Sequence, residues 1–235
     1  MKHHTSLPLI ATLGLAAAAS AEITGAYVVS YTVMTEDFGG TAVSVNVQDL
    51  YLSSDDAADT VLNVFTLDLV AAAQVTYFQS DYGPGWSRTQ PGGPFTNGAL
   101  EMADSFVTIG GVLQGTFQPE QTSGVEDGVG LDGDFGGNDA AFPGGGAGWF
   151  NGNTAAPTGQ VGMVNRGDNA GFELGVLVGR FAYEGDFTLE GSTLWTTWNQ
   201  GIGTAPVQAG FTVTPAPGAL ALFGLAGFAL RRRRS

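Results

Sequence analysis

The sequence predicts an all-β fold, namely an antiparallel β-sandwich or jelly roll with long glycine-rich loops. Short segments rich in Val, Thr, Phe and Tyr recur throughout residues 22–213. The chain's 37 glycines are scattered without a fixed period, which excludes collagen and simple repeat arrays. No segment of this region shows the 3.6-residue periodicity of a helix over ten or more residues. Together these features favour a single β domain over residues 22–213.

Ten segments of this domain are expected to be strands. Alternation is clearest where Val43, Val45 and Val47 are separated by polar residues, a pattern typical of a strand with one buried face. Glu190–Ser192 is expected to form a bulge or kink inside a strand, because glycine interrupts an otherwise β-rich run. The expected strands are 25–35, 41–53, 61–70, 74–79, 105–109, 112–118, 160–165, 172–184, 187–198 and 207–213.

Two connections between these strands are long, residues 80–98 and 119–158. Both have the composition of turns and little periodicity. Connections of this length in a compact domain are commonly binding loops, spacers or disordered segments. Neither is expected to be a domain boundary, because each side alone has too few strands to enclose a core.

The expected domain is strongly acidic. All 22 Asp and Glu residues lie between Glu22 and Glu190, and only Arg88, Arg166 and Arg180 oppose them within residues 22–214, a formal charge of −19. Such a surface repels phosphate backbones, so no nucleic-acid partner is expected. Each arginine is expected to pair with a nearby carboxylate rather than to bind an anionic ligand.

Residues 22–214 contain no cysteine, histidine or lysine. Their absence excludes disulfides, Cys/His zinc sites, Ser-His-Asp triads, catalytic thiols and lysine Schiff bases from this region. Carboxylate pairs are the remaining acid/base groups, and they leave a glycosidase open. With so many acidic residues, some pair falls at a suitable distance by chance. We therefore expect a protein that is not an enzyme.

Residues 1–21 have the three-part pattern of a secretory signal peptide, expected to be helical. A basic opening at Lys2 precedes an apolar run over 7–19, and the small residues Ala19 and Ala21 stand where a signal peptidase requires them. Cleavage is expected after Ala21, which makes signal peptidase and the secretion machinery partners of the chain. A buried N-terminal helix of the domain is the alternative.

The C-terminal segment, residues 214–235, also has three parts. Pro215-Ala216-Pro217 is followed by an uncharged run over 218–230, expected to be a short helix, and then by Arg231, Arg232, Arg233 and Arg234. Thirteen helical residues span about 20 Å, less than the roughly 30 Å of hydrocarbon in a bilayer. The arginines are expected to stay on the cytoplasmic side, which places the acidic domain outside.

This arrangement resembles the PEP-CTERM sorting tail of exported bacterial proteins, and the resemblance covers only residues 214–235. It implies that an exosortase, an integral-membrane cysteine protease, recognises the tail and processes the chain near the Pro-Glu-Pro motif. Pro215 and Pro217 match the prolines and Arg231–Arg234 match the basic end, whereas Ala216 replaces the glutamate. The resemblance implies a cell-envelope or extracellular location. A plain C-terminal membrane anchor is the alternative.

Two kinds of binding residue can be proposed from the sequence. Closely spaced oxygen ligands in a glycine-rich loop suit calcium, although the spacing does not match an EF-hand, and a hydrated acidic loop is the favoured alternative. The candidate ligands are Asp132, Asp134, Asn138 and Asp139, with a second acidic cluster at Asp55, Asp56 and Asp59.

Tryptophans provide the other candidates. Trp86 and Trp149 lie in the two long connections, where exposed indoles could stack on the sugar rings of an extracellular polysaccharide. Packing beneath the loops is the favoured alternative for both, given how much area an indole buries. Trp195 and Trp198 lie at the end of an expected strand and are expected to be core or belt residues.

The leading functional hypothesis is an exported, non-catalytic protein of the cell surface or extracellular matrix, sorted by its tail. The alternatives are a secreted carbohydrate-binding module or glycoside hydrolase, and a calcium-stabilised adhesin. No cofactor other than calcium is expected.

Overall fold

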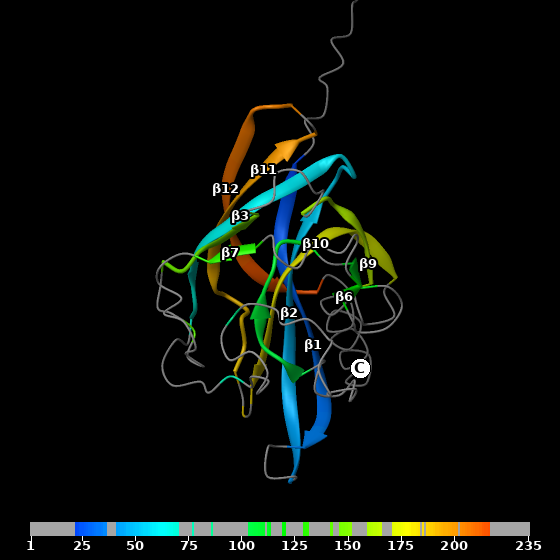
Figure 1. Cartoon of the computed structure of the whole chain (residues 1–235), viewed down its shortest axis with the longest axis vertical. Helices are drawn as coiled ribbons and strands as arrows, with labels where there is room; N and C mark the ends of the chain where they lie inside the picture. Colours follow the sequence, from blue (N-terminus) through cyan, green and yellow to red (C-terminus); the bar gives the residue numbers. More distant parts are fainter. Residues whose placement is uncertain are drawn as a thin grey trace, which may run out of the picture.

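The structure is a computed structural model that describes residues 22–36, 41–70, 77, 86, 103–110, 112–113, 119–120, 129–131, 142, 146–151, 159–165, 171–183, 185, 187–201 and 203–216. This part of the chain is built from β-strands (Figure 1), so the predicted all-β class is confirmed. No helix among these residues is long and apolar enough to cross a membrane. The expected helices at 1–21 and 218–230 lie outside the described residues.

Twelve strands are described. They are β1 (Ile23–Glu36), β2 (Ala42–Ser54), β3 (Asp59–Asp68), β4 (Phe106–Val107), β5 (Val112–Leu113), β6 (Pro119–Glu120), β7 (Val129–Leu131), β8 (Trp149–Asn151), β9 (Gly162–Asn165), β10 (Phe172–Tyr183), β11 (Thr193–Gln200) and β12 (Pro206–Pro215).

Ten of these strands form one continuous sheet. Its order is β4-β10-β2-β1-β12-β11-β3-β8-β7, β9 pairs with β10, and β5 and β6 form a separate pair. The pairs are antiparallel except for β1 and β12, which run parallel from Ala26↔Val213 to Val28↔Pro215. The expectation of a purely antiparallel sheet is therefore wrong at this one junction. It joins the first and last described strands of the chain.

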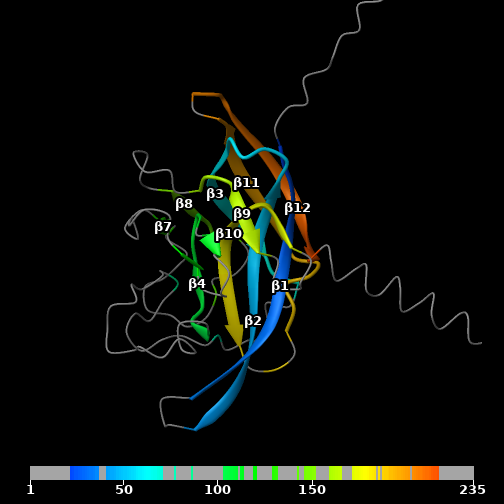
Figure 2. The same cartoon turned by 90° about the vertical axis from the view of Figure 1, so that its right-hand side faces the viewer.

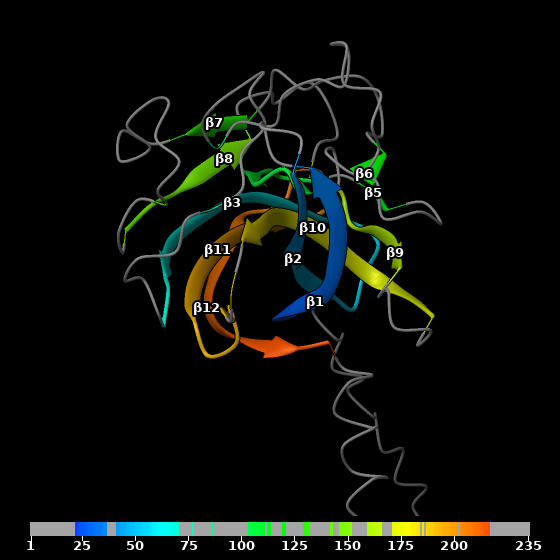
Figure 3. The same ribbon diagram turned by 90° about the horizontal axis from the view of Figure 1, so that it is seen from below.

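The sheet curls until its two halves face each other across the core, as the view along the long axis shows (Figure 3). Closure is completed by residues 159–161, which bond to β3 before entering β9: Val61 N–H donates to Gly159 O (2.8 Å) and Val161 N–H donates to Asp59 O (2.9 Å). Gly159 has φ +84°, and a Cβ there would lie 2.2 Å from Val61 O, so only glycine allows this approach. The result is a nearly closed barrel, and the expected sandwich or jelly roll is not confirmed.

The β1–β2 hairpin is the longest feature of the fold, and its far end projects beyond the rest of the sheet (Figures 1 and 2). β10 pairs with β2 only from Asn46 to Ser53, so Ala42–Val45 pair with β1 alone. Met34, which lies on this projecting end, is 65% exposed.

The main core lies between the two halves of the sheet. It contains Val28 from β1, Leu50 and Leu52 from β2, Val64 from β3 and Leu194 from β11. The middle of β2 is also buried on its other face, where Tyr51 packs with Tyr27 and Leu177. The alternation in 41–53 suggested one buried face, but Val47–Leu52 are buried on both because neighbours cover each side.

Nine of the ten predicted strands overlap a described strand, and three differences from the prediction are informative. The segment 187–198 becomes a strand only at Thr193, because Glu190 and Gly191 form a turn in which Gly191 has φ +85°. The expected bulge inside that strand is therefore wrong. Within 119–158, β6, β7 and β8 were not predicted. Of the expected strand 74–79, only Tyr77 is described, in an isolated bridge to Tyr183.

Candidate functional site

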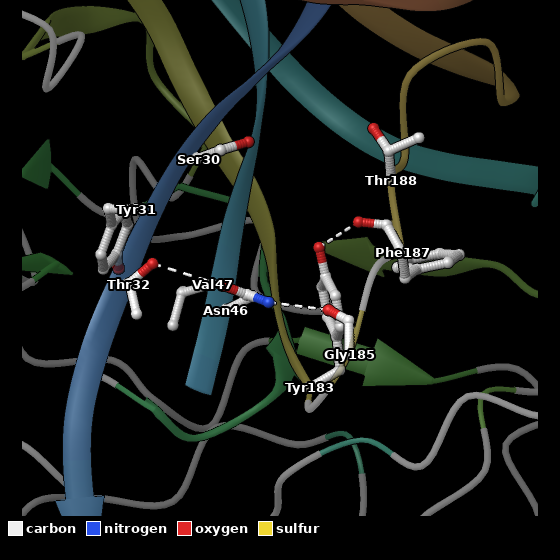
Figure 4. A pocket seen from close by; sticks show the side chains of 9 residues that line it. All are labelled: Ser30, Tyr31, Thr32, Asn46, Val47, Tyr183, Gly185, Phe187 and Thr188. Carbon is white, nitrogen blue, oxygen red and sulfur yellow. Dashed lines mark hydrogen bonds between the residues drawn. The ribbon is translucent and has the colours of Figure 1, made fainter. Parts of the chain in front are cut away.

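A pocket of about 400 Å³ lies between β1, β2 and the segment that follows β10 (Figure 4). It is lined mainly by uncharged polar groups and aromatic rings: Ser30, Tyr31, Thr32, Asn46, Val47, Tyr183, Gly185, Phe187 and Thr188. The polar side chains come from facing positions of two strands, since Ser30 pairs with Gln48 and Thr32 with Asn46.

Hydrogen bonds hold the walls of this pocket. Thr32 Oγ1 donates to Asn46 Oδ1 (3.3 Å), and Asn46 Nδ2 donates to Gly185 O (2.7 Å). Behind them, Gln48 is buried, and its Nε2 donates to the Tyr183 hydroxyl (2.7 Å) and to Phe187 O (3.0 Å). The Tyr183 hydroxyl also donates to Phe187 O. The alternation of this strand puts Asn46 and Gln48 on its polar face. Asn46 is half-buried, whereas Gln48 is buried because its amide also bonds to the backbone of Phe187 and Leu189.

The lining groups suit binding rather than proton transfer at neutral pH. Among the residues that the structure describes, none that lines the pocket has a carboxylate, histidine or lysine side chain. Burial raises the pKa of Tyr31 far above its ordinary value, and the charge of Asp49 raises it further, while Arg180 opposes the shift. The Tyr31 phenol therefore stays protonated. A ligand with uncharged polar groups fits such a lining best.

An ion pair is buried directly behind the pocket. Arg180 Nε donates to Asp49 Oδ1 (2.7 Å), Arg180 Nη2 donates to Asp49 Oδ2 (3.0 Å), and both side chains are fully buried. Tyr31 donates to Asp49 Oδ2 (3.1 Å), and the Phe106 ring lies 5.4 Å from the guanidinium carbon. The predicted pairing of arginine with carboxylate is confirmed here. Arg88 and Arg166 lie outside the described residues.

Burial by itself lowers the pKa of Arg180, but the charge and hydrogen bonds of Asp49 outweigh it and raise the pKa overall. The Arg180 guanidinium therefore stays charged at any ordinary pH. Because the guanidinium is enclosed by Asp49 and aromatic rings, it is not presented to a ligand. We assign the pair to the fold, where it connects β2 with β10.

The second acidic cluster is used to build the turn between β2 and β3. Asp55 Oδ1 accepts Glu22 N–H (2.7 Å), Asp56 Oδ1 accepts Ala58 N–H (2.8 Å), and Asp59 Oδ2 accepts the Ser54 hydroxyl (2.7 Å). The Asp56 contact is an Asx turn, a common device at tight chain reversals.

Burial raises the pKa of Asp59, the Ser54 hydrogen bond opposes the rise, and nearby carboxylates add to it. Within the described ranges, no group of three or more His, Cys, Asp or Glu side chains is placed to hold a metal ion. The calcium candidates Asp132, Asp134, Asn138 and Asp139 lie outside those ranges.

Trp86 is buried rather than exposed, with a relative exposure of 2%. Its ring meets Phe142 edge-on at 4.7 Å between centroids and Tyr77 at 4.9 Å, and Phe181 lies at 5.5 Å. These rings form part of the main core. Trp86 therefore does not form an exposed platform for a sugar ring. Its position agrees with the alternative that it packs beneath a loop.

Trp149 is 1% exposed and lies in β8 rather than in a loop. Its indole N–H donates to Thr108 O (2.9 Å), so the side chain connects β8 to the chain that follows β4. Those two strands lie near opposite ends of the sheet order, and Trp149 therefore helps to close the barrel. The prediction that the Trp149 indole is exposed is therefore wrong, because this side chain, like that of Trp86, is buried in the core.

The other two tryptophans differ from each other. Of the two expected positions, core or belt, Trp198 takes the core position, whereas Trp195 is 46% exposed and lies outside the core. The signal that separates them is their place in β11, where buried and outward residues alternate from Thr193 to Trp198.

Two residues of the C-terminal motif belong to the fold. Pro215 is the last residue of β12, opposite Val28, and Ala216 is buried in a cluster with Tyr27 and Val29. The Ala216 N–H donates to Val28 O (3.0 Å). The remaining sorting and cleavage residues lie outside the described residues: Ala19, Ala21, Pro217, Arg231, Arg232, Arg233 and Arg234.

Comparison with known proteins identifies no relative: no family model matches the chain, and neither curated proteins nor solved structures provide a match.

Proposed function

We propose that this chain is an exported protein without catalytic activity, retained at the cell surface or in the extracellular matrix through its C-terminal segment. The proposal rests on the two end signals of the sequence and on the acidic domain between them. Signal peptidase, the secretion machinery and an exosortase-like membrane enzyme are its proposed partners, with the membrane contacted through residues 218–234.

The observation that carries this proposal is the agreement between the ends of the fold and the expected cutting points. β1 begins at Ile23, so removal of residues 1–21 leaves every described strand intact. β12 ends at Pro215, and Ala216 makes the last described backbone bond to β1. The described fold therefore ends within the first three residues of the segment proposed for sorting.

The burial of Ala216 limits where such a tail is cut. A protease needs an extended, accessible backbone, whereas Ala216 is 5% exposed and bonded to Val28. We therefore propose that any processing occurs after Ala216. The same burial gives a physical reason for the missing glutamate, because a carboxylate at position 216 would lie in the cluster of Tyr27 and Val29.

The described lining of the pocket is of the kind that binds uncharged polar ligands. Within the described residues it holds no carboxylate, and the buried Asp49, which accepts a hydrogen bond from the lining residue Tyr31, is paired with Arg180. The calcium-stabilised adhesin remains an alternative that depends on Asp132–Asp139. The carbohydrate-binding alternative does not involve Trp86 or Trp149, because both side chains are buried.

The test is a fractionation experiment in the native host, using the full chain. Wild-type protein is expected in the envelope or extracellular fraction, with residues 1–21 removed. A variant with Arg231–Arg234 replaced by Asn should leave that fraction, because the basic end that holds the tail at the membrane is lost. A matched variant, Met34→Ala, changes an exposed residue far from the tail and should distribute like the wild type. Identical distribution of the tail variant and the wild type would refute the sorting role.

A further inference from the structure

The outer surface of β8, β3, β11 and β12 differs from the rest of the described barrel. Side chains alternate along these strands, so Val64, Trp149 and Thr196 face the core, each at most 1% exposed, while their neighbours face outward. We call the outward set the aromatic face. It consists of Asn63, Phe65, Phe150, Trp195, Thr197 and Gln208.

Trp195 lies flat on this face. It pairs directly with Gly210 on one side and with Phe65 on the other. A Cβ on Gly210 would lie 2.9 Å from Trp195 Cε2 and 3.2 Å from Cδ2 and Cζ2, so the indole plane covers the glycine backbone. Any larger residue at position 210 would lift the ring. The indole is 46% exposed, and its free face is directed to solvent.

A second row of the aromatic face lies beside the first. Phe150 is 46% exposed and pairs with Asn63, which pairs with Thr197, which pairs with Gln208. Strand spacing of ~4.8 Å and a rise of ~3.3 Å per residue put Phe150 and Trp195 about 12 Å apart. The two exposed rings are thus close enough for one extended polymer to contact both.

The polar residues between these rings are oriented and available. Asn63 Oδ1 accepts the Thr197 N–H (3.0 Å), which fixes the amide plane. The Asn63 side-chain NH₂ group has no hydrogen-bond partner among the residues that the structure describes. Gln208 is exposed in the same row. Hydrogen-bonding groups therefore flank an apolar platform.

We propose that the aromatic face is a binding site for a neutral polysaccharide. A pyranose ring presents C–H groups on its face and hydroxyls around its edge, which matches a flat indole flanked by amides and a threonine. An apolar protein partner would bury the Asn63 and Gln208 amides without compensation. A polyanionic glycan would be repelled by the surplus of acidic residues, which gives residues 22–214 a charge of −19.

This inference concerns the body of the protein and does not depend on export or on the tail. Its test uses the full chain in co-sedimentation with cellulose and chitin, two insoluble neutral polysaccharides. Alginate beads serve as the anionic comparison. Trp195→Ala removes the platform, and Gly210→Ala keeps the indole but displaces it. Phe172→Ala is the matched control, because Phe172 is an exposed aromatic residue (57%, against 46% for Trp195) on β10, outside the face.

The wild type and Phe172→Ala are expected to bind at least one of the neutral polymers and not alginate. Trp195→Ala and Gly210→Ala should each weaken binding by about tenfold or more, as expected for the loss of a central aromatic contact. Thermal unfolding checks that both variants fold, and acrylamide quenching of wild-type fluorescence should decrease on binding. Absence of wild-type binding to both neutral polymers, or equal binding by Trp195→Ala and the wild type, would overturn the proposal. A Trp195-dependent dimer without polysaccharide binding would identify the face as a contact between copies and would overturn it as well.

Discussion

Replacing Arg180 with methionine should destabilise the barrel more than most single substitutions. The change removes the cation but keeps an unbranched side chain of similar length. It leaves the Asp49 carboxylate buried, with the Tyr31 hydroxyl as its remaining side-chain hydrogen bond in the described structure. An unpaired buried charge is costly because no solvent replaces the lost partner.

The magnitude follows from the geometry of the pair. Both side chains are at most 1% exposed, and two hydrogen bonds of 2.7 and 3.0 Å join them. Removal of one partner from such a pair costs about 3–5 kcal/mol. For a folded body of this size, each kcal/mol shifts Tm by about 2–4 °C, so Tm should fall by about 6–20 °C. That loss is a large share of the roughly 5–15 kcal/mol that stabilises a typical domain.

Chemical denaturation with urea measures this loss, and a double variant separates charge from packing. Arg180→Met combined with Asp49→Leu removes both charges, so it should recover at least half of the stability lost in the single variant. A single variant within about 1 kcal/mol of the wild type would refute the reasoning, because it would mean that the carboxylate is solvated. A double variant less stable than the single one would show that packing, not charge, dominates.

Three further predictions concern other residues of the barrel. Asp59→Asn should raise Tm at pH 7 and change it little at pH 3. Because folding raises the pKa of Asp59, the protonated carboxyl contributes most to stability below its ordinary pKa, and that contribution is lost as pH rises through the folded-state pKa. Ala216→Glu should lower the free energy of unfolding by about 1–3 kcal/mol in urea titrations, since it places a carboxylate among apolar side chains. Trp149→Phe should cost about 2 kcal/mol and speed amide exchange of nearby strands, because the Thr108 carbonyl loses its indole donor.

Each of these predictions has a result that contradicts it. A lower Tm for Asp59→Asn at pH 7 would mean that the ionised form of Asp59 is required for the turn. Full stability of Ala216→Glu would mean that residue 216 is not packed against β1, and would remove the physical reason given for the missing glutamate. Unchanged exchange in Trp149→Phe would show that the barrel closes without the indole.

The sequence predicts the strands of this protein better than their arrangement. Alternation of Val43, Val45 and Val47 is a local signal, and β2 forms where it predicts. The parallel pairing of β1 with β12 brings together residues at opposite ends of the chain, and no local pattern encodes it. β8 was not predicted because its three residues are held by the Trp149 side chain and by β3, which are tertiary contacts.

The candidate site shows the same division. Three arginines among 22 acidic residues predict ion pairing, and Arg180 does pair with Asp49. The exposure of Trp86 is harder to predict than ion pairing, because the loop-like composition around this residue does not reveal the aromatic cluster that covers it. The exposure of Trp195 could have been predicted from its place in the alternating pattern of β11. Its packing flat against Gly210 could not, because Gly210 lies on another strand, β12.

We propose that the acidic barrel works outside the cytoplasm and is directed there by its ends. Mass spectrometry of the intact protein, recovered from fractionated cells of its native host, tests this claim most directly. We predict an N-terminus at Glu22 and recovery in the envelope or extracellular fraction, with any C-terminal cut located after Ala216. Recovery of the uncut chain, Met1 to Ser235, from the cytoplasmic fraction would contradict the account.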